Sequence, residues 1–252
     1  MLILITNDDG IEAKGLRTLH SGLSKKWETV VVAPAQEQSA TSHSMTLNRS
    51  LRYRDLGGNV FSVEGTPTDC VMFAVYSLLP RKPDLVVSGI NHGANLADDV
   101  TYSGTVAAAI EGTLLGIPSV AISVPKKGNP TFDRHNIFDD AARFSGQLVS
   151  RILKEGMPEE TLLNVNVPNC SWDEIDGVRI TRLGKRIYRD VIERERGSDG
   201  QSYFRIGGNA PDWEGSEDSD VSVIDRNMIS ITPLRLDLTN YEAMEHLRKW
   251  EF

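Results

Sequence analysis

The sequence predicts an α/β protein with a mostly parallel sheet and helices on both of its faces. Apolar runs of strand length alternate with segments of helical periodicity up to about residue 167. Several of the apolar runs are followed by polar, glycine-containing loops, as at the ligand-binding edge of open α/β sheets. The chain has 252 residues, 40% of them hydrophobic and 25% charged, which is ordinary for one large globular domain.

The first predicted elements are a strand at residues 1–6 and a helix around Leu16, Leu19 and Leu23. The five apolar residues that open the chain indicate a strand buried on both faces, as in parallel sheets. A second buried strand is predicted over residues 29–34, where a proline stops it, and a shorter one over residues 59–63.

The following helix has a clear start signal in Thr66, Pro67 and Asp69. Threonine is a good N-cap, proline suits the first helical position, and a carboxylate is favourable near the positive end of the helix dipole. The alternation then continues through a strand at 84–89, a helix at 104–115, a strand at 117–124, a helix at 139–155 and a strand at 162–167.

The character of the chain changes after residue 167. Residues 178–215 are rich in Arg, Asp, Glu and Gly with scattered aromatic residues, residues 228–232 alternate as a strand, and residues 241–250 form an amphipathic helix. The first of these segments is either a solvated hairpin or an arm that packs on another subunit, and its aromatic residues favour the arm. We therefore divide the chain into a core at 1–177 and a C-terminal arm and helix at 178–252.

Composition excludes several classes of partner. The net charge of -8 argues against binding to nucleic acid polymers, which requires clustered Lys and Arg. Two cysteines, Cys70 and Cys170, cannot form a disulfide framework and have no metal-site spacing. No basic and apolar leader precedes the first strand, and no apolar stretch is long enough to span a bilayer. We expect a cytoplasmic protein without membrane contact.

The loop after the first strand contains the adjacent carboxylates Asp8 and Asp9. Neighbouring carboxylates repel each other, and a hard cation such as Mg²⁺ or Mn²⁺ relieves that repulsion. Three other polar loops, at 34–44, 88–95 and 102–105, also follow predicted strands or begin a helix. Because strand ends of one parallel sheet converge, we expect all four loops to face one cleft.

These loops together offer two carboxylates, a hydroxyl and a side-chain amide, an all-oxygen set that suits Mg²⁺ or Mn²⁺ and not zinc. Ser103, Gly104 and Thr105 begin an alanine-rich helix. Free backbone N–H groups and the positive dipole end make such a helix start a phosphate site. A metal beside an anion-binding helix start indicates metal-assisted hydrolysis of a phosphate ester.

The chain resembles the SurE-type survival-protein nucleotidases. The resemblance begins with Ile3-Leu4-Ile5-Thr6-Asn7-Asp8-Asp9-Gly10 and spans nearly the whole sequence, through Gln38-Ser39-Ala40, Gly65-Thr66-Pro67-Thr68-Asp69-Cys70-Val71, Val87-Ser88-Gly89-Ile90-Asn91, Tyr102-Ser103-Gly104-Thr105-Val106, Asn164-Val165-Asn166-Val167-Pro168 and Ile229-Ser230-Ile231-Thr232-Pro233-Leu234. Asn227-Met228 departs from the Gly-Tyr common in that family, although asparagine tolerates a left-handed backbone.

The resemblance implies one divalent cation held by Asp8, Asp9, Ser39 and Asn91. It implies hydrolysis of nucleoside 5′- and 3′-monophosphates, in some members also of short polyphosphate, with Asp8 and Asp9 as the catalytic pair. The family fold is Rossmann-like, a three-layer α/β/α arrangement, and a C-terminal arm is exchanged within a homodimer or tetramer. We add Asn95 to Ser103, Gly104 and Thr105 as a phosphate-binding candidate.

Two alternatives stay open. Aspartyl-phosphate phosphatases also place Asp after a first strand, but they use an Asp-x-Asp pair, whereas these acids are adjacent. A nucleotide-binding module without hydrolytic activity is the second alternative. His43 and His92 lie in the site loops and could contact substrate, but exposed histidines in loops usually have no role, and we expect Glu111 to serve packing or solvation.

Overall fold

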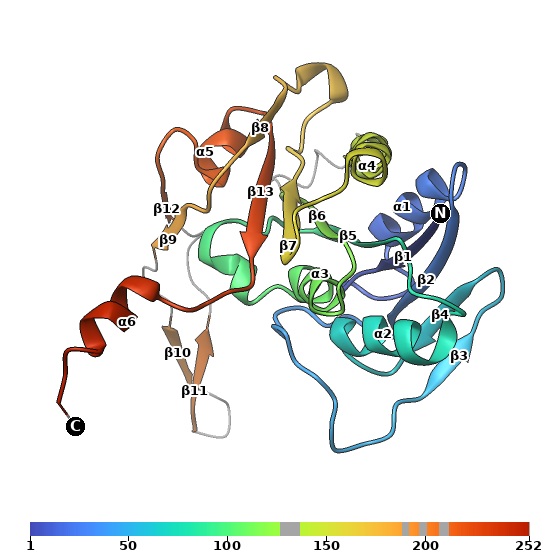
Figure 1. Cartoon of the computed structure of the whole chain (residues 1–252), viewed down its shortest axis with the longest axis horizontal. Coiled ribbons are helices and arrows are strands. Elements are labelled where there is room, and N and C mark those ends of the chain that lie inside the picture. The colour runs from blue at the N-terminus through green and yellow to red at the C-terminus, as the bar shows by residue number, and fades with distance from the viewer. Residues whose placement is uncertain (127–136, 188–191, 197–200, 207–211, 252) are drawn as a thin grey trace.

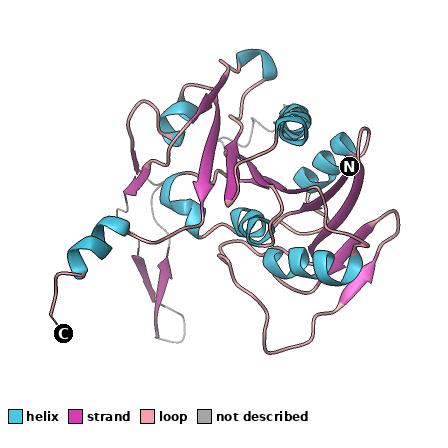
Figure 2. Cartoon of the chain, in the orientation of Figure 1, coloured by secondary structure: helices cyan, strands magenta, loops and turns pink. Residues whose placement is uncertain are grey.

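The computed structural model describes residues 1–126, 137–187, 192–196, 201–206 and 212–251. A nine-stranded sheet with the order β3-β4-β2-β1-β5-β6-β7-β13-β8 forms the middle layer (Figure 1). Helices α1 and α4 cover one face and α2 and α3 cover the other (Figure 2). The predicted α/β class with three layers is confirmed.

The strands of this sheet match the apolar runs of the sequence. Six of the eight neighbouring pairs are parallel, and only β3 with β4 and β13 with β7 are antiparallel. The bounds are β1 Leu2–Thr6, β2 Glu28–Pro34, β3 Tyr53–Asp55, β4 Val60–Val63, β5 Leu85–His92, β6 Ser119–Val124, β7 Thr161–Asn166, β8 Val178–Ile180 and β13 Ile229–Arg235.

Strand β1 lies between β2 and β5 and is buried on both faces, as its uninterrupted apolar sequence predicts. Ile3 and Ile5 pack with α1 and α4, whereas Leu2 and Leu4 pack with residues of β2 and α2 on the opposite face. The strand order reverses at β1, with β2 and β4 on one side and β5, β6 and β7 on the other. Such a reversal creates a crevice at the carboxyl ends of the strands.

The helices have the expected local signals. In α2, the Thr66 hydroxyl accepts from Asp69 N at 3.1 Å, and Asp69 Oδ2 accepts from Thr66 N at 2.8 Å. This reciprocal pair is a capping box, so the predicted helix start is confirmed. The helices are α1 Lys14–Leu23, α2 Pro67–Phe73, a π-helix Ala74–Leu78, a 3₁₀-helix Ala97–Thr101, α3 Gly104–Leu114, α4 Ile137–Glu155, a 3₁₀-helix Trp172–Glu174, α5 Asp220–Asp225 and α6 Tyr241–Leu247.

Strand β5 is longer than predicted. It continues past Gly89 to His92, because a bulge between Ser88 and Asn91 lets Asn91 pair again with Ser123 of β6. The bulge places an extra residue against β6 and redirects the end of the strand. Asn91 therefore lies at the end of a strand, whereas the sequence placed it in a loop.

The C-terminal region does not separate from the sheet at residue 177. Strand β13 pairs antiparallel with β7 from Ser230 to Arg235, and β8 pairs with β13. The boundary predicted at residue 177 thus does not coincide with the edge of the sheet. Two small hairpin sheets lie outside it, formed by β10 Ile192–Arg196 with β11 Ser202–Ile206 and by β9 Lys185–Ile187 with β12 Asp212–Glu214.

Parts of the predicted arm, residues 188–191, 197–200 and 207–211, lie outside the described residues. Within the described part, the β10–β11 hairpin and α6 extend away from the central sheet (Figure 1). The turn before β13 uses Asn227 with φ 55°, which confirms that asparagine takes the left-handed backbone there. Among the described residues, no helix is long and apolar enough to cross a membrane.

Candidate functional site

The loop after β1 is a tight turn that carries the two carboxylates at the carboxyl end of the strand. Gly10 has φ +98°, and a Cβ atom there would lie 3.2 Å from the backbone carbon of Gln36. Asn7 Nδ2 donates to Gly10 O at 2.9 Å and closes the turn. Asp8 is buried and Asp9 half-buried, so only one of the two carboxylates is readily reached by solvent.

Asp8 lies against the start of α3. Its Oδ1 accepts a hydrogen bond from the Thr105 hydroxyl, and the Thr105 backbone N–H also stabilises the carboxylate. Burial raises the pKa of Asp8 from 3.8 to about 6, the bond from Thr105 opposes that rise, and repulsion from Asp9 adds to it. In this structure the start of α3 therefore already contacts a carboxylate of the protein itself, that of Asp8.

Asp9 joins the first loop to the end of β5. Its Oδ2 accepts from the backbone N–H of His92 at 3.0 Å. One residue earlier, Asn91 Nδ2 donates to Gly93 O at 2.8 Å, which fixes the amide group. Within the described part of the chain, neither Asp9 Oδ1 nor Asn91 Oδ1 takes part in a hydrogen bond. Both oxygens are therefore available to a ligand.

The loop after β2 closes over the same carboxylates. Gln38 N donates to Asp8 O at 2.7 Å, and Ser42 N donates to Tyr102 O at 3.1 Å. The predicted ligand Ser39 is exposed on this loop, and its hydroxyl donates to Glu37 Oε1 at 2.6 Å. Together with the contacts of Asp8 and Asp9, these bonds bring the four predicted loops into one site.

The start of α3 packs too closely on Asp8 for any residue larger than glycine. A Cβ atom on Gly104 would lie 2.8 Å from Asp8 Cβ and 3.0 Å from its Oδ2. The Ser103 hydroxyl accepts from Val106 N at 3.1 Å and caps the helix. The side chains of Ser103 and Thr105 are thus already hydrogen-bonded, and phosphate binding by this segment stays a prediction that rests on backbone N–H groups.

Asn95, the remaining phosphate candidate, is buried in a network of amide side chains. Its Nδ2 donates to Ser123 Oγ at 2.7 Å, and its N donates to Asn166 Oδ1 at 2.9 Å. Its carbonyl oxygen accepts from the side chains of Asn164 and Asn166. These bonds fix the segment after β5 to β6 and β7, and phosphate contact by Asn95 stays a prediction.

Sequence reasoning missed two features of this site. The first is the network around Asn95, which two asparagines within one short strand could have indicated, because asparagine is uncommon in strands. The second is a pair between His43 and Glu111, whose Nε2 and Oε2 atoms are 2.9 Å apart. Glu111 is buried on α3, so the pair holds the loop after β2, which carries His43, against that helix.

The residues present fit a hard divalent cation. Asp8, Asp9, Ser39 and Asn91 offer only oxygen donors, the type that Mg²⁺ and Mn²⁺ prefer. No group of three or more His, Cys, Asp or Glu side chains that could hold a metal occurs in the described ranges, so a cation bound at Asp8 and Asp9 would take its other ligands from hydroxyl, amide or water oxygens. Two buried oxygens beside it, Asn7 Oδ1 and Ser88 Oγ, find no hydrogen-bond partner among the described residues. Such orphaned groups are rare unless a water or ion completes them.

Comparisons with known proteins point to one family. The sequence model of the family described as survival protein SurE matches residues 3–190. The chain is 48% identical over 252 residues to 5′-nucleotidase SurE of Pelobacter propionicus, with 100% of both chains covered. It is 45% identical over 251 residues to 5′-nucleotidase SurE of Geobacter sulfurreducens, covering 100% of this chain and 94% of the relative. The crystal structure of the SurE protein from Aquifex aeolicus superposes with a TM-score of 0.85, at 38% identity, covering 98% of each chain.

Proposed function

This chain belongs to the SurE survival-protein family and is a 5′-nucleotidase, a phosphoric monoester hydrolase, and we propose that it works with one divalent cation, Mg²⁺ or Mn²⁺. The observation that carries the metal proposal is the adjacent pair Asp8 and Asp9. One is tied to Thr105 on α3 and the other to the end of β5, so hydrogen bonds hold the two acids together despite their repulsion.

In this proposal Asp8, Asp9, Ser39 and Asn91 hold the cation. When bound, the cation supplies polarisation of the phosphoryl oxygens and makes hydroxide available near neutral pH. The protein contributes the geometry: the turn at Gly10 aims both carboxylates at the crevice, and the bulge in β5 brings Asn91 beside them. Asp9, which is half-buried and keeps Oδ1 free of hydrogen bonds within the described residues, orients the attacking water.

The substrate phosphate would lie between these ligands and the start of α3. There the backbone N–H groups of Ser103 and Gly104, the Thr105 N–H that the phosphate would share with Asp8, and the positive dipole end of α3 favour an anion. Asn95 holds the adjoining segment in place. We extend the proposal to nucleoside 3′-monophosphates and to short polyphosphate, which share the phosphoryl group and differ in what is attached to it.

Exposed apolar groups support an assembly of more than one subunit. None of the residues of α6 is buried, and Leu238, Tyr241 and Trp250 are 93%, 63% and 55% exposed. On the hairpin formed by β10 and β11, Ile192 and Phe204 are also exposed. Large apolar side chains that gather on projecting segments need a surface to bury against. We propose that this surface belongs to a second copy of the chain, in a homodimer or a tetramer of dimers.

The test of the function is phosphate release. We expect the purified protein to release phosphate from nucleoside monophosphates when Mg²⁺ or Mn²⁺ is present, and to stop when a chelator removes the metal. Turnover that continues undiminished in the chelated, metal-free protein would refute the role of the cation. Detection of a covalent phosphoenzyme on Asp8 would instead favour the aspartyl-phosphate alternative.

A further inference from the structure

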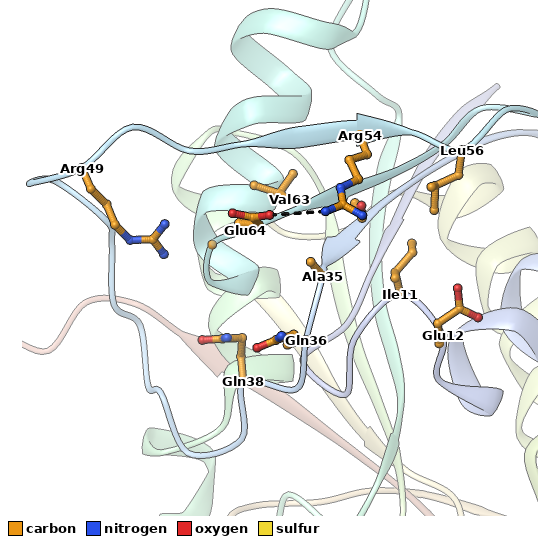
Figure 3. A pocket seen from close by; sticks show the side chains of 12 residues that line it. Ile11, Glu12, Ala35, Gln36, Gln38, Arg49, Arg54, Leu56, Val63 and Glu64 are labelled. Carbon is orange, nitrogen blue, oxygen red and sulfur yellow. Dashed lines mark ion pairs between the residues drawn. The ribbon is translucent and has the colours of Figure 1, made fainter.

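A cavity of about 590 Å³ lies beside the candidate metal site, at the carboxyl ends of β2 and β4 (Figure 3). Its walls include Gln36 and Gln38 from the loop after β2, and Glu64 directly after β4. It opens at the same edge of the sheet as the Asp8–Asp9 turn, because β1, β2 and β4 are parallel. Its volume is within the range of small-molecule sites, about 300–1,000 Å³.

The cavity and the metal loop share parts of the backbone. Gln38, which lines the cavity, donates its N–H to Asp8 O at 2.7 Å. Ile11, two residues after Asp9, also lines the cavity and donates its N–H to Pro34 O at 2.8 Å. The cavity wall is therefore hydrogen-bonded directly to the loop that carries Asp8 and Asp9, so the cavity lies next to the proposed phosphate position.

The lining suits a flat, uncharged group with polar edges. Ile11 and Leu56 form an apolar side, and the guanidinium of Arg49 lies on the opposite side of the cavity (Figure 3). The amides of Gln36 and Gln38 supply both donors and acceptors. An aromatic base could thus stack beneath a guanidinium, contact apolar side chains and satisfy its edge with amide groups.

The charges argue against a second phosphate site. Arg54 lies 3.9 Å from Glu64, which offsets its charge, and Glu12 adds a second carboxylate to the lining. Arg49 takes part in no ion pair or hydrogen bond within the part of the chain that is described. With Glu12 and Glu64 in the same lining, the Arg49 guanidinium would bind a dianion weakly, but it can stack on a base.

We propose that this cavity receives the nucleobase and ribose of the substrate, with Arg49 stacking on the base and Gln36 hydrogen-bonding to its edge. The inference rests on the proposed function, since the phosphate of the same molecule occupies the metal site. It makes Arg49 and Gln36 specificity-determining residues that act on the nucleoside and not on the phosphoryl group.

The test compares two phosphomonoesters that differ only in what carries the phosphate. Adenosine 5′-monophosphate and glycerol 2-phosphate are assayed with the intact protein and with the variants Gln36→Ala and Arg49→Ala. Arg52→Ala is the matched control, because Arg52 is a neighbouring exposed arginine, 4.0 Å from Glu64, that does not line the cavity. All three side chains are exposed, so unchanged thermal unfolding is expected.

For Arg49→Ala we expect kcat/KM with adenosine 5′-monophosphate to fall about tenfold, mainly through KM, because a cation–π contact is lost. Glycerol 2-phosphate should be hydrolysed as before, and Arg52→Ala should behave as the unchanged protein with both substrates. Equal losses for both substrates in Arg49→Ala, or no loss for the nucleotide, would overturn the cavity assignment while leaving the nucleotidase activity intact.

Binding of adenosine itself separates this inference from the proposed function. Adenosine lacks the phosphate, so its binding, followed by ligand-observed NMR, depends on the cavity alone. If no phosphomonoester is hydrolysed with any divalent metal, the proposed function fails. The cavity assignment is then supported by adenosine binding that Arg49→Ala weakens and Arg52→Ala does not, and overturned by binding that is absent or equal in all three proteins.

Discussion

Asp8 is held in a position that favours its protonated form when no cation is bound. Burial raises its pKa from 3.8 to about 6. A carboxyl group whose folded pKa lies above its unfolded value binds its proton more tightly in the folded state. Its contribution to stability is therefore lost as the pH rises from 3.8 to about 6, and it stays lost above that pH.

Replacing Asp8 with asparagine should separate stability from activity. The neutral amide removes a buried charge, so the metal-free Asp8→Asn protein should melt at the same or a higher temperature than the unchanged protein at pH 8. That advantage should disappear at pH 4. Phosphate release should fall by at least about 100-fold, because a metal supplies several kcal/mol of transition-state stabilisation and each 1.36 kcal/mol is tenfold in rate.

Asp9→Asn is the companion variant and should lose activity to a similar degree, with less effect on melting because Asp9 is only half-buried. Both variants keep the shape of the side chain, so loss of fold cannot explain loss of turnover. Normal turnover in both proteins would remove Asp8 and Asp9 from the metal site.

The pH dependence of metal binding should follow the same group. A cation and a proton compete for Asp8, so affinity should rise as the pH increases toward about 6 and level off above it. Thr105→Ala removes the hydroxyl that lowers the pKa of Asp8, and it should move this rise to higher pH. Thr105→Ser keeps the hydroxyl and should keep the original profile. Calorimetric titration with Mn²⁺ across pH 5 to 8 measures this, and identical profiles for the Ala and Ser variants would contradict it.

The residues that the sequence identified at this scale are those with local signals. Asp8 and Asp9 follow an apolar run and precede a glycine, so their place at a strand end could be predicted. The pair of His43 and Glu111 could not, because the two residues are 68 positions apart and neither has a distinctive neighbour. Only the close approach of the second loop to α3 brings them together.

Among the elements, α3 has the tightest constraint at its first residue. A bulky residue at Gly104 would obstruct the phosphate site predicted at this helix start, but the structure shows a nearer obstacle in Asp8. Gly104→Val should displace the Asp8 side chain, since even a Cβ atom would lie 2.8 Å from Asp8 Cβ. We expect weaker Mn²⁺ binding as well as lower turnover, with Gly104→Ala intermediate. A Gly104→Val protein that binds Mn²⁺ normally and fails only in KM would restore the original explanation.

The contact between the loop after β2 and α3, made by His43 and Glu111, leads to another prediction. Glu111→Gln removes the charge that His43 pairs with at 2.9 Å, and the loop carrying Ser39 should become less ordered. Hydrogen exchange over residues 38–44 should accelerate, and metal affinity should fall by about tenfold, as is typical when a residue that supports a metal ligand is changed. Glu155→Gln is the control, because Glu155 pairs with Lys154 on the surface at the end of α4. Unchanged exchange in Glu111→Gln would show that the pair does not hold the loop.

Elements were predictable where their ends are encoded locally. The start of α2 is an example, since Thr66, Pro67 and Asp69 stand within four residues of one another. The extension of β5 to His92 was not, because a bulge depends on the register with β6 and no single-strand pattern reports that register.

At the scale of the whole molecule, the position of β13 could not be read from the sequence. Its alternating residues predicted a strand, but its insertion between β7 and β8 depends on contacts across 64 to 74 residues with β7 and across 51 residues with β8. This position makes a truncation of the whole C-terminal region unsuitable as a test of assembly. Removing everything from Asn227 onward would delete a strand of the central sheet and expose β7, so aggregation would not report on subunit exchange.

A shorter deletion tests the assembly alone. Removing residues 237–252 takes away α6, which buries none of its side chains in its own chain, and leaves β13 paired with β7. We expect the intact protein to scatter light as a dimer or tetramer at micromolar concentration and the shortened protein to have a lower mass. Thermal unfolding of the subunit should change little, because no buried contact within the chain is lost.

The control for this deletion is a surface change that keeps α6. Leu238→Ser with Tyr241→Ser removes two of the exposed apolar side chains without shortening the chain. If these groups are buried by a second copy, the double variant should shift the mass toward the monomer, because burial of apolar surface contributes about 25 cal/mol per Å² of apolar area removed from water. An intact protein that is monomeric, or a shortened protein with unchanged mass, would contradict assembly through this arm and would leave the site at Asp8 and Asp9 unaffected.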